Sequence, residues 1–350
     1  MIDRLSRRDF VLSGAAAVPL VRTAVKQAGG FAAPAVLLRR SVRPVVVASR
    51  NGIRGVAKAM DLLNHGTDTL DAVIEAVKIQ ELDPTDQTVG YGGLPNAEGV
   101  VQLDASCMHG PTRRAGAVAA LEGIKTPSEV ARCVLKYTNH ILLVGKGAQD
   151  FAVQFGFKIE DLLTDASRQA WLRWRANLNP DDDYLDVPEG ETFAAPPHGT
   201  INCSAINANG DISTVTTTAG LAWKIPGRVG DSAIIGAGDY ADNDVGAAGS
   251  TGRGESNIMV CGGYSIVQSM RRGMSPTDAC LETLRHVVAI SEPRLLDAAG
   301  RPKFDLTYYA LNKRGEFGSA GLYSGTSYSV HDGREARIAD SAYLFERPHT

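Results

Sequence analysis

The sequence has few cysteines, and those it has are not grouped. Five cysteines stand far apart along 350 residues, and no two of them form a CxxC pair. A disulfide framework is read from an even set of cysteines at regular spacing, and a structural zinc site from paired ligands. The sequence therefore predicts neither, and the cysteines are expected to behave as small, buried, apolar side chains.

Long apolar runs and an excess of one charge are also missing. Each longer apolar stretch is interrupted by glycine, proline or a charged residue, so no membrane span is expected in the mature protein. The formal net charge is only −3, which gives no electrostatic reason to expect a nucleic-acid partner. No internal repeat is visible. These absences are typical of an ordinary globular protein.

The N-terminal segment differs from the rest of the chain. The stretch SRRDFVLSGAAAVPLV places Arg7 and Arg8 before a modest apolar run, and small residues follow up to Ala33. This order resembles a twin-arginine export signal with a signal-peptidase site, while a basic amphipathic tail is the alternative. We expect residues 1–40 to be an export signal and tail, and the protein to be periplasmic or exported. Residues 41–350 are expected to form a single domain.

Apolar periodicity predicts helices and strands in separate parts of the chain. Both proposed capping signals have a Ser or Thr followed three residues later by an acid: Thr126 with Glu129, and Ser275 with Asp278. The predicted helices cover residues 53–66, 69–83, 126–138 and 275–290. The predicted strands are residues 43–51 and two hairpins around Asn209-Gly210 and Arg314-Gly315. Helices that flank strand-rich regions favour an α/β or α+β sandwich.

Residues 160–198 interrupt this pattern. They are polar, acidic and rich in proline, which predicts a long exposed connection that ends at Gly199. Long connections inside compact domains are uncommon and are often functional or disordered. Thr200 is therefore expected to begin a buried strand immediately after this connection.

The position of Thr200 allows two interpretations. In the first interpretation, Thr200 is an ordinary strand residue, since threonine favours strands. On the second, a strained Gly199-Thr200 bond lets the hydroxyl attack its own carbonyl and move the acyl group from nitrogen to oxygen, after which water cuts the chain. The new terminal threonine then holds a nucleophilic hydroxyl and an α-amine base with an ordinary pKa of about 7.7–8.0.

Several downstream residues can serve such a nucleophile. Arg228 and Asp231, separated by a glycine-bearing turn, can hold the α-carboxylate and α-ammonium of a free amino acid, or they form a surface ion pair. Thr251 and Gly252 can face an oxyanion, or they lie in a glycine-rich turn. Thr218 can tune the nucleophile, or it is a strand threonine.

Five stretches together carry a family resemblance that covers nearly all of the chain from Pro44 onward. They are LDPTDQTVGYGGLPNAEGVVQLDASCM, HILLVGKGAQDFAVQFGF, HGTINCSAI, KIPGRVGDSAIIGAGDYADNDVGAAGSTGRGE and VQSMRRGMSPTDAC. The chain thereby resembles the glycosylasparaginase (aspartylglucosaminidase) family of N-terminal-nucleophile hydrolases, which is related to isoaspartyl peptidase/L-asparaginase. The combination of GRVGDS, GAGxYA and STGxGE after a Gly-Thr or Asp-Thr junction is highly specific for it.

The resemblance implies a four-layer αββα sandwich that needs no metal or cofactor. It implies a cut at His198-Gly199-Thr200 into chains 41–199 and 200–350, which form an αβ heterodimer that pairs into (αβ)2. The implied catalytic residues are Thr200, Thr218, Thr251 and Gly252. The expected substrate-binding residues are Arg228, Asp231, Thr251, Gly252 and Gly254, together with Arg50, which departs from the family pattern. The implied reaction is hydrolysis of the side-chain amide of glycosylasparagine.

Two residues depart from the family pattern. The junction of glycosylasparaginases is usually His-Asp-Thr, whereas Gly199 gives the Gly-Thr junction of the isoaspartyl peptidase branch. The first strand of the family usually ends in Thr-Trp, whereas this one reads Ser49-Arg50, so a carboxylate or a sugar hydroxyl is expected to contact Arg50. Both departures keep β-aspartyl peptides and asparagine open as alternative substrates.

Two rival functions follow from other features. Gly236, Gly238 and Ala241 fit a loose dinucleotide fingerprint with Glu255 beyond it, but no helix followed by a strand separates them. A binding protein that uses Arg228 and Asp231 without cutting is the second rival. Self-cutting of the chain discriminates against both.

Overall fold

The computed structural model describes residues 41–178 and 199–347, and within this part of the chain the strands form two sheets. The larger sheet has the order β12 (Ala336–Asp340), β11 (Ser327–His331), β1 (Val45–Ser49), β5 (Ile201–Ile206), β6 (Ile212–Thr218), β2 (Gln102–His109), β3 (Arg114–Glu122), β4 (Leu142–Val144). The smaller sheet has the order β13 (Ala342–Phe345), β10 (Phe317–Tyr323), β9 (Leu306–Asn312), β8 (Gly246–Gly252), β7 (Asp239–Asp242).

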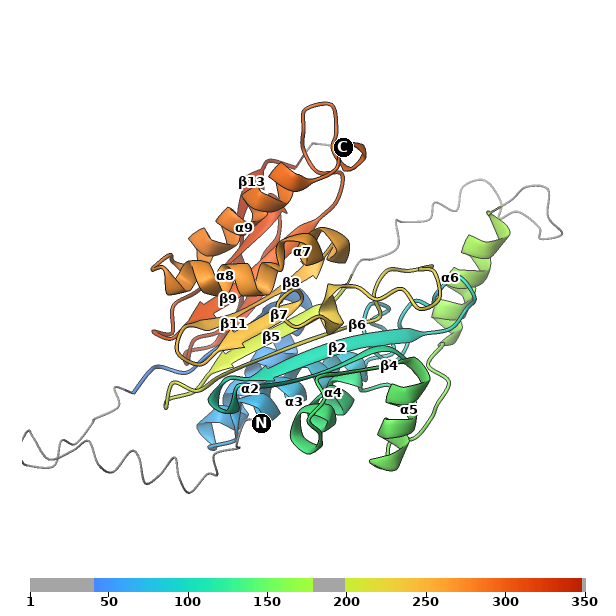
Figure 1. The fold of residues 1–350 in the computed structure, drawn as a ribbon, viewed down its shortest axis with the longest axis horizontal. Coiled ribbons are helices and arrows are strands. Elements are labelled where there is room, and N and C mark those ends of the chain that lie inside the picture. The colour runs from blue at the N-terminus through green and yellow to red at the C-terminus, as the bar shows by residue number, and fades with distance from the viewer. Residues whose placement is uncertain (1–40, 179–198, 348–350) are drawn as a thin grey trace, which may run out of the picture. The chain divides into compact units, whose positions relative to one another are not determined.

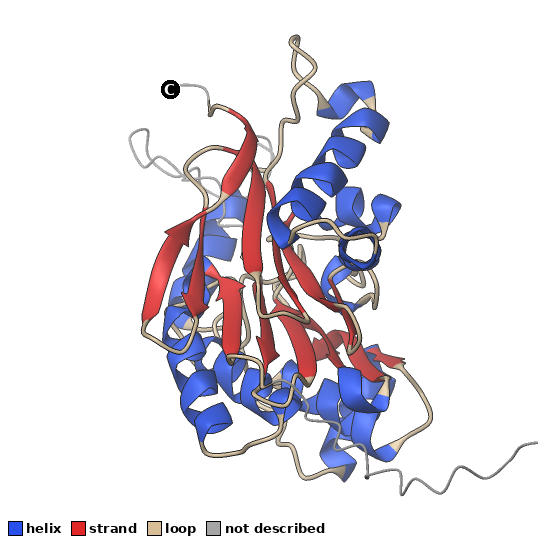
Figure 2. Ribbon diagram, turned by 90° about the vertical axis from the view of Figure 1, so that its left-hand side faces the viewer, coloured by secondary structure: helices blue, strands red, loops and turns tan. Residues whose placement is uncertain are grey.

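Helices cover the outer face of each sheet, as Figures 1 and 2 show. The larger sheet packs against α2 (Ile53–Asn64), α3 (Thr69–Glu81), α4 (Pro127–Tyr137) and α5 (Gly145–Gln154). The smaller sheet packs against α8 (Gly262–Arg271) and α9 (Pro276–Ile290), and α7 (Gly254–Val260) packs against these two helices. The predicted αββα sandwich, an α+β fold, is confirmed.

Alternation along the strands produces the layers of this sandwich. In β1, Val46 and Ala48 join the apolar cluster beneath α2 and α3, whereas Val45 and Val47 join the cluster between the sheets. Successive side chains of a strand point to opposite faces, so a strand that is apolar on both faces belongs in the middle of such a sandwich. A third cluster lies between the smaller sheet and helices α8 and α9.

The strand that begins after Thr200, β5, also alternates, but one of its faces is apolar and the other is polar. Ile201 and Cys203 of β5 face the helices, while Asn202 and Ser204 face the second sheet and bond to hydroxyls of β6. The predicted hairpin at Asn209-Gly210 joins β5 to β6, and Gly210 has a φ of 81°, which favours glycine. The interior between the sheets is therefore polar near the start of β5.

Two expectations about local structure were wrong. Residues 160–178 are not all extended connection, because Asp165–Ala176 form helix α6, which begins after Thr164 as its N-cap. Polar composition concealed this helix, which is anchored by a hydrogen bond of 3.3 Å from Trp171 Nε1 to the Ala97 carbonyl. The second error concerns Thr126, whose side chain makes no cap hydrogen bond.

At Thr126 the amide of Glu129 donates to the backbone carbonyl oxygen of Thr126 at 3.1 Å and not to its hydroxyl. The carboxylate of Glu129 accepts a hydrogen bond of 3.0 Å from Lys78 Nζ instead of turning back to the helix start. At α9 the expected cap is present, since the Asp278 amide donates to Ser275 Oγ at 3.1 Å. The same spacing therefore gave a side-chain cap at the start of α9 and none at the start of α4.

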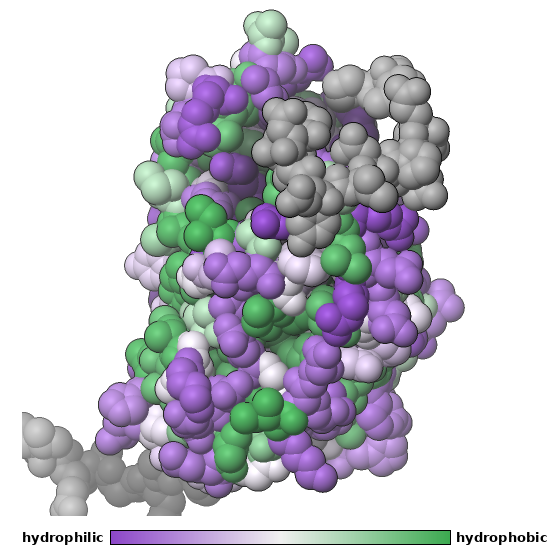
Figure 3. Space-filling view, turned by 90° about the vertical axis from the view of Figure 1, so that its right-hand side faces the viewer, coloured by the Kyte–Doolittle hydropathy of each residue, from purple (hydrophilic) through white to green (hydrophobic). Residues whose placement is uncertain are grey.

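The surface near the β4 edge of the larger sheet is partly apolar. Leu142 and Val144 are exposed on β4, and Tyr137 stacks on Phe155 with both rings exposed. Figure 3 shows apolar side chains reaching the surface among polar ones on the side of the molecule where α5 lies. Within the described residues no helix is both long and apolar enough to cross a bilayer, and no acid, histidine and cysteine cluster suited to a metal ion occurs.

Candidate active site

Thr200 and Thr218 lie opposite each other on neighbouring strands. The register of β5 and β6 pairs Ile201 with Thr217, so extending it by one residue places Thr200 against Thr218. Thr200 Oγ1 donates to Thr218 Oγ1 at 3.0 Å, and Thr218 Oγ1 donates to the Gly199 carbonyl oxygen at 2.8 Å. A backbone N–H from Gly220 completes the partners of the Thr218 hydroxyl at 2.8 Å. One hydroxyl thus connects the Thr200 hydroxyl to the carbonyl before it.

Gly199 is packed directly against Thr88. A Cβ built on Gly199 would lie 2.0 Å from Thr88 Cβ and 2.1 Å from Thr88 Oγ1, well inside contact distance. Thr88 is itself held, because its amide donates to Asp86 Oδ1 at 3.0 Å and its hydroxyl donates to the same oxygen. The glycine at this junction therefore allows a close approach that a larger residue would prevent without movement of Thr88.

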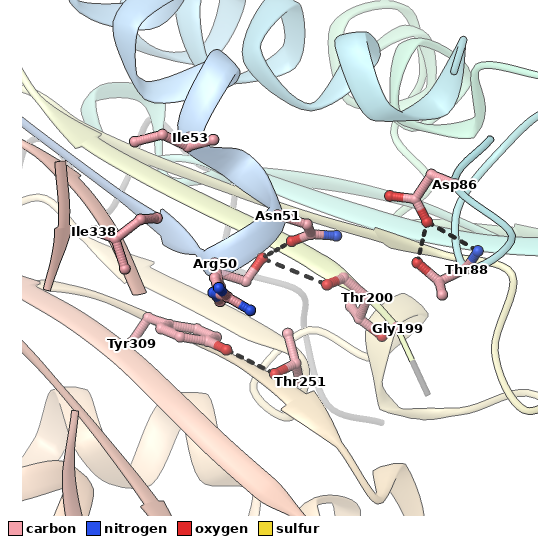
Figure 4. Close-up of a pocket in the computed structure, with 11 residues that line it drawn as sticks. Arg50, Asn51, Ile53, Asp86, Thr88, Gly199, Thr200, Thr251, Tyr309 and Ile338 are labelled. Carbon is pink, nitrogen blue, oxygen red and sulfur yellow. Dashed lines mark hydrogen bonds between the residues drawn. The ribbon is translucent and has the colours of Figure 1, made fainter. Parts of the chain in front are cut away.

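Two cavities meet at Gly199 and Thr200. The smaller, of about 10 Å³, is also lined by Thr218, Arg228, Asp231 and Gly252. The larger, of about 570 Å³, is also lined by Arg50, Asn51, Ile53, Thr251, Tyr309 and Ile338 (Figure 4). A molecule bound at Thr200 can therefore contact residues of both cavities.

The carboxylate of Asp231 is fixed in the smaller cavity. Asp231 Oδ2 accepts hydrogen bonds from Ser250 Oγ at 2.6 Å and from Asn257 Nδ2 at 2.7 Å. Tyr308 holds Asn257 in turn by donating to its Oδ1 at 2.7 Å. Burial raises the pKa of Asp231, while the hydrogen bonds from Ser250 and Asn257 oppose that rise. The result is a buried acid with a fixed orientation, suited to receive an ammonium group.

Arg228 is held by an acid that the sequence alone did not single out for this role. Its Nε and Nη2 donate to Glu255 Oε1 at 3.0 and 2.8 Å, which orients the guanidinium from one side. Hydrogen bonding to Arg228 lowers the pKa of Glu255 against the opposing effect of burial. Arg228 and Asp231 do not form the surface ion pair that was the alternative, since each is bonded to other partners.

Two glycines permit the close packing of this region. Gly252 has a φ of 119°, and a Cβ there would lie 2.3 Å from the Asp305 carbonyl oxygen. A Cβ on Gly254 would lie 2.7 Å from Asp231 Oδ1. On the larger-cavity side, the hydroxyls of Thr251 and Tyr309 are 2.7 Å apart, and burial raises the pKa of Tyr309 to about 12. Thr251 and Gly252 thus lie between the two cavities.

Asp104 and Lys224 make hydrogen bonds to the backbone next to the site residues. Asp104 lies opposite Thr218 on β2 and accepts from the Gly230 amide at 3.3 Å, within the turn between Arg228 and Asp231. Lys224 Nζ donates to the carbonyls of Gln102 and Ala219 at 2.7 and 3.0 Å, which fixes the chain just after Thr218. Burial lowers the pKa of Lys224, and Asp104 opposes this effect.

Ser49 connects the first strand to the start of β5. Its Oγ donates to Asn51 Oδ1 at 2.7 Å and lies 3.4 Å from the Thr200 carbonyl oxygen, while the Asn202 amide donates to it at 3.3 Å. Arg50 follows on η2 (Arg50–Gly52) with an exposed side chain. Figure 4 shows Arg50, Tyr309 and Thr251 around the space next to Thr200.

The structure brings most of the predicted site residues together. Thr200, Thr218, Thr251, Gly252, Arg228, Asp231, Gly254, Gly199 and Arg50 all lie in or beside the two cavities, whereas His198 lies outside the described residues. Sequence reasoning missed Thr88, Asp104, Lys224, Ser250, Asn257 and Tyr309, although all but Asn257 and Tyr309 stand in the quoted motifs.

The dinucleotide-binding alternative fails on topology. Asp239 pairs with Gly249 and Ala241 with Ala247, so β7 and β8 form an antiparallel hairpin. A dinucleotide fingerprint requires a strand, a helix and a parallel strand in that order. Glu255, its proposed ribose acid, binds Arg228 instead.

Comparison with known proteins gives a consistent set of relatives. A family described as asparaginase matches residues 37–293. An N(4)-(beta-N-acetylglucosaminyl)-L-asparaginase of Elizabethkingia miricola is 38% identical over 305 residues, which are 87% of this chain and 86% of that protein. The protein of the same name from Rattus norvegicus is 36% identical over 279 residues, 74% of this chain and 78% of its own. A probable isoaspartyl peptidase/L-asparaginase of Arabidopsis thaliana is 31% identical over 335 residues, 86% of this chain and 90% of its own.

Proposed function

The chain belongs to the asparaginase family of amidohydrolases, and from this premise we propose that it hydrolyses the side-chain amide of N4-(β-N-acetylglucosaminyl)-L-asparagine after cutting itself before Thr200. The observation that carries this proposal is the hydroxyl chain from Thr200 through Thr218 to the Gly199 carbonyl, at 3.0 and 2.8 Å. It lies where the two cavities meet.

Self-cutting uses the same hydroxyl as catalysis. Thr200 Oγ attacks the Gly199 carbonyl carbon, the C–N bond breaks, and the hydroxyl proton ends on the freed α-amine. The hydrogen bond from Thr218 to the Gly199 carbonyl oxygen supports this step, since it stabilises the charge that develops there. Water then hydrolyses the ester, which leaves Gly199 as a C-terminus and restores the Thr200 hydroxyl.

Turnover repeats this chemistry on the substrate. The α-amine of Thr200 takes the hydroxyl proton while Oγ attacks the side-chain amide carbon, and Thr251 with Gly252 faces the oxyanion. The C–N bond then breaks and the glycosylamine leaves with a proton. Water hydrolyses the β-aspartyl ester and releases aspartate.

The residues around the smaller cavity select the amino-acid part of the substrate, and this cavity, which has room for about one water molecule, must widen to admit it. Arg228 pairs with the α-carboxylate and Asp231 with the α-ammonium, each already oriented by Glu255 or by Ser250 and Asn257. Both groups must be free for this pairing. The proposed substrate is therefore a single amino-acid derivative and not an asparagine within a protein chain.

Assembly and location are part of the same proposal. Chains 41–199 and 200–350 would form an αβ unit that pairs into (αβ)2, and the exposed apolar residues at the β4 edge offer surface for such pairing. The Arg7-Arg8 signal supports export to the periplasm. The intact mass of the complex in solution tests the pairing, and fractionation of the producing cells tests the export.

The first test combines intact mass with a nucleophile variant. Wild-type protein is expected to contain two chains, one beginning Thr-Ile-Asn-Cys, and to release aspartate from glycosylasparagine. Thr200→Ala is expected to stay uncut and to show no measurable hydrolysis, because it lacks the attacking oxygen. Thr112→Ala, which changes an exposed threonine on η3 (Gly110–Thr112), serves as the control and should behave as wild type. Hydrolysis by Thr200→Ala at the wild-type rate would overturn the mechanism, and an uncut wild type would indicate a binding protein.

A further inference from the structure

Arg50 lines the larger cavity with an uncommitted charge. Its side chain is exposed at the cavity, and within residues 41–178 and 199–347 its guanidinium makes no hydrogen bond or ion pair. A guanidinium has five N–H donors and stays charged at all ordinary pH values. Such a group beside the nucleophile is available to bind an anion.

The other cations near Thr200 are already committed. Arg228 is bonded twice to Glu255, and Lys224 is buried with two carbonyl partners. Both lie toward the smaller cavity, where the amino-acid part of the substrate is expected. The charge of Arg50 therefore acts on a different part of the substrate, namely the part that lies in the larger cavity.

Among the described residues that line the larger cavity, Asp86 is the acid, and its carboxylate is bonded to a neighbour. Asp86 Oδ1 accepts from the amide and the hydroxyl of Thr88. Figure 4 shows Asp86 and Thr88 on one side of Thr200 and Arg50 on the other. Arg50 is thus the charged group on its own side of the nucleophile, among the residues that line this cavity.

Apolar side chains lie on the same side as Arg50. Ile53 and Ile338 line the cavity there, and Tyr309 presents its ring beside them (Figure 4). A cation next to an aliphatic wall suits an organic anion that has a carboxylate at one end and an apolar body. An arginine binds a carboxylate through two parallel N–H···O bonds, which fixes both its position and its orientation.

We propose that Arg50 selects leaving groups that carry a carboxylate, and specifically the α-carboxylate of an apolar amino acid joined through its nitrogen to the aspartate side chain. This inference rests on the proposed function, because Thr200, Arg228 and Asp231 act on the aspartyl part as before. Arg50 pairs with the leaving-group carboxylate, and Ile53 and Ile338 contact its side chain. The leaving amine is then a free amino acid.

The test uses two substrates that differ only in this charge. β-Aspartyl-leucine has the carboxylate, and β-aspartyl-leucinamide has a neutral amide in its place. Wild-type protein is expected to show at least about tenfold higher kcat/KM for the acid, mostly through KM. Arg50→Gln should remove this preference, and Arg50→Lys should restore part of it, since lysine keeps the charge without the planar fork.

Glycosylasparagine, which has a neutral leaving group, is measured beside the pair. Turnover of glycosylasparagine by wild type tests the proposed function, and the intact mass of Arg50→Gln shows whether this variant is cut. Equal kcat/KM for acid and amide in wild type, or an equal loss on both in Arg50→Gln, overturns this inference alone when glycosylasparagine is still hydrolysed. Loss of turnover of all three substrates by the cut wild type overturns the proposed function and this inference together.

Discussion

The two cavities beside Thr200 differ in how their charged groups are held. In the smaller cavity, Arg228 is bonded to Glu255 and Asp231 to Ser250 and Asn257, within about 10 Å³ of free space. In the larger cavity, Arg50 is exposed and faces about 570 Å³. The cavity on one side of Thr200 is thus nearly closed and lined by hydrogen-bonded charges, and the cavity on the other side is open.

This difference predicts that the smaller cavity recognises one fixed chemical group, whereas the larger cavity accepts a wider range of groups. A preorganised charge pair loses little freedom when a ligand binds, so it recognises one geometry strongly. An exposed arginine must be ordered by its ligand, and the pair it forms is weaker because water screens it. We therefore expect changes in the smaller cavity to cost more than changes in the larger one.

The largest effect is expected from Arg228→Ala. Removing one partner of a partly buried, hydrogen-bonded charge pair costs about 2–5 kcal/mol, which corresponds to a loss of roughly 30-fold to several-thousand-fold in kcat/KM. Steady-state kinetics on glycosylasparagine measures this loss. Arg113→Ala is the control, because its ion pair with Asp244 lies on the surface with both side chains mostly exposed. Equal kinetics in the two variants would remove Arg228 from the substrate site.

A smaller effect is expected from Gly199→Ala, at the residue that both cavities share. The added Cβ would lie 2.0 Å from Thr88 Cβ, so Thr88 and its hydrogen bonds to Asp86 must shift before the junction fits. We expect self-cutting to slow by about tenfold, which corresponds to roughly 1.4 kcal/mol in the barrier. The fraction of cut chain against time, read by mass spectrometry, measures the rate.

Gly147→Ala provides the matched control for this variant. Gly147 lies on α5, and a Cβ there meets no atom within 4 Å. It should cut at the wild-type rate. If Gly199→Ala cuts just as fast, the contact with Thr88 does not restrict the junction.

The smallest effect is a pH dependence confined to the smaller cavity. Burial raises the pKa of Asp231, so on acidification this carboxylate gains a proton at a higher pH than an ordinary aspartate does. The protonated acid no longer attracts an α-ammonium group. Inhibition by the product aspartate should therefore weaken on acidification, and it should begin to weaken at a higher pH than the ordinary aspartate pKa of about 3.9 would give.

The matching control for the pH profile is Asp231→Asn. It should bind aspartate weakly and without this pH dependence, because the amide does not titrate. Constant inhibition by aspartate from neutral to acidic pH in wild type would show that Asp231 does not pair with the ammonium group. The same slope in both proteins would contradict the assignment as well.

Local signals in the sequence predicted the strands around Thr200 correctly. Asn209-Gly210 marks a tight turn, and it correctly predicted the hairpin of β5 and β6 whose register brings Thr200 opposite Thr218. The cap at Ser275 was likewise found from its own neighbours. These features depend on residues within one turn or one hairpin, which a sequence displays directly.

The groups that orient the site depend on distant contacts and were not predicted. Glu255 meets Arg228 across 27 positions, and Thr88 meets Gly199 across a much longer stretch of chain. Glu129 was assigned to a helix cap but pairs with Lys78, which is 51 positions away. Which acid meets which cation follows from the packing of the sheets and helices, and no local pattern encodes it.

The strand order of the larger sheet gives the proposed cut a lasting consequence. Strands β1, β2, β3 and β4 precede Gly199, whereas β5, β6, β11 and β12 follow it, and the sheet alternates between the two groups. The two pieces are therefore woven into one sheet, and neither can leave without breaking its hydrogen bonds with the other. Separated pieces would have to find each other again in solution, whereas the uncut chain folds in a single molecule. The proposed cut would therefore make unfolding hard to reverse, and the lifetime of the cut enzyme would be governed by the rate at which this sheet opens.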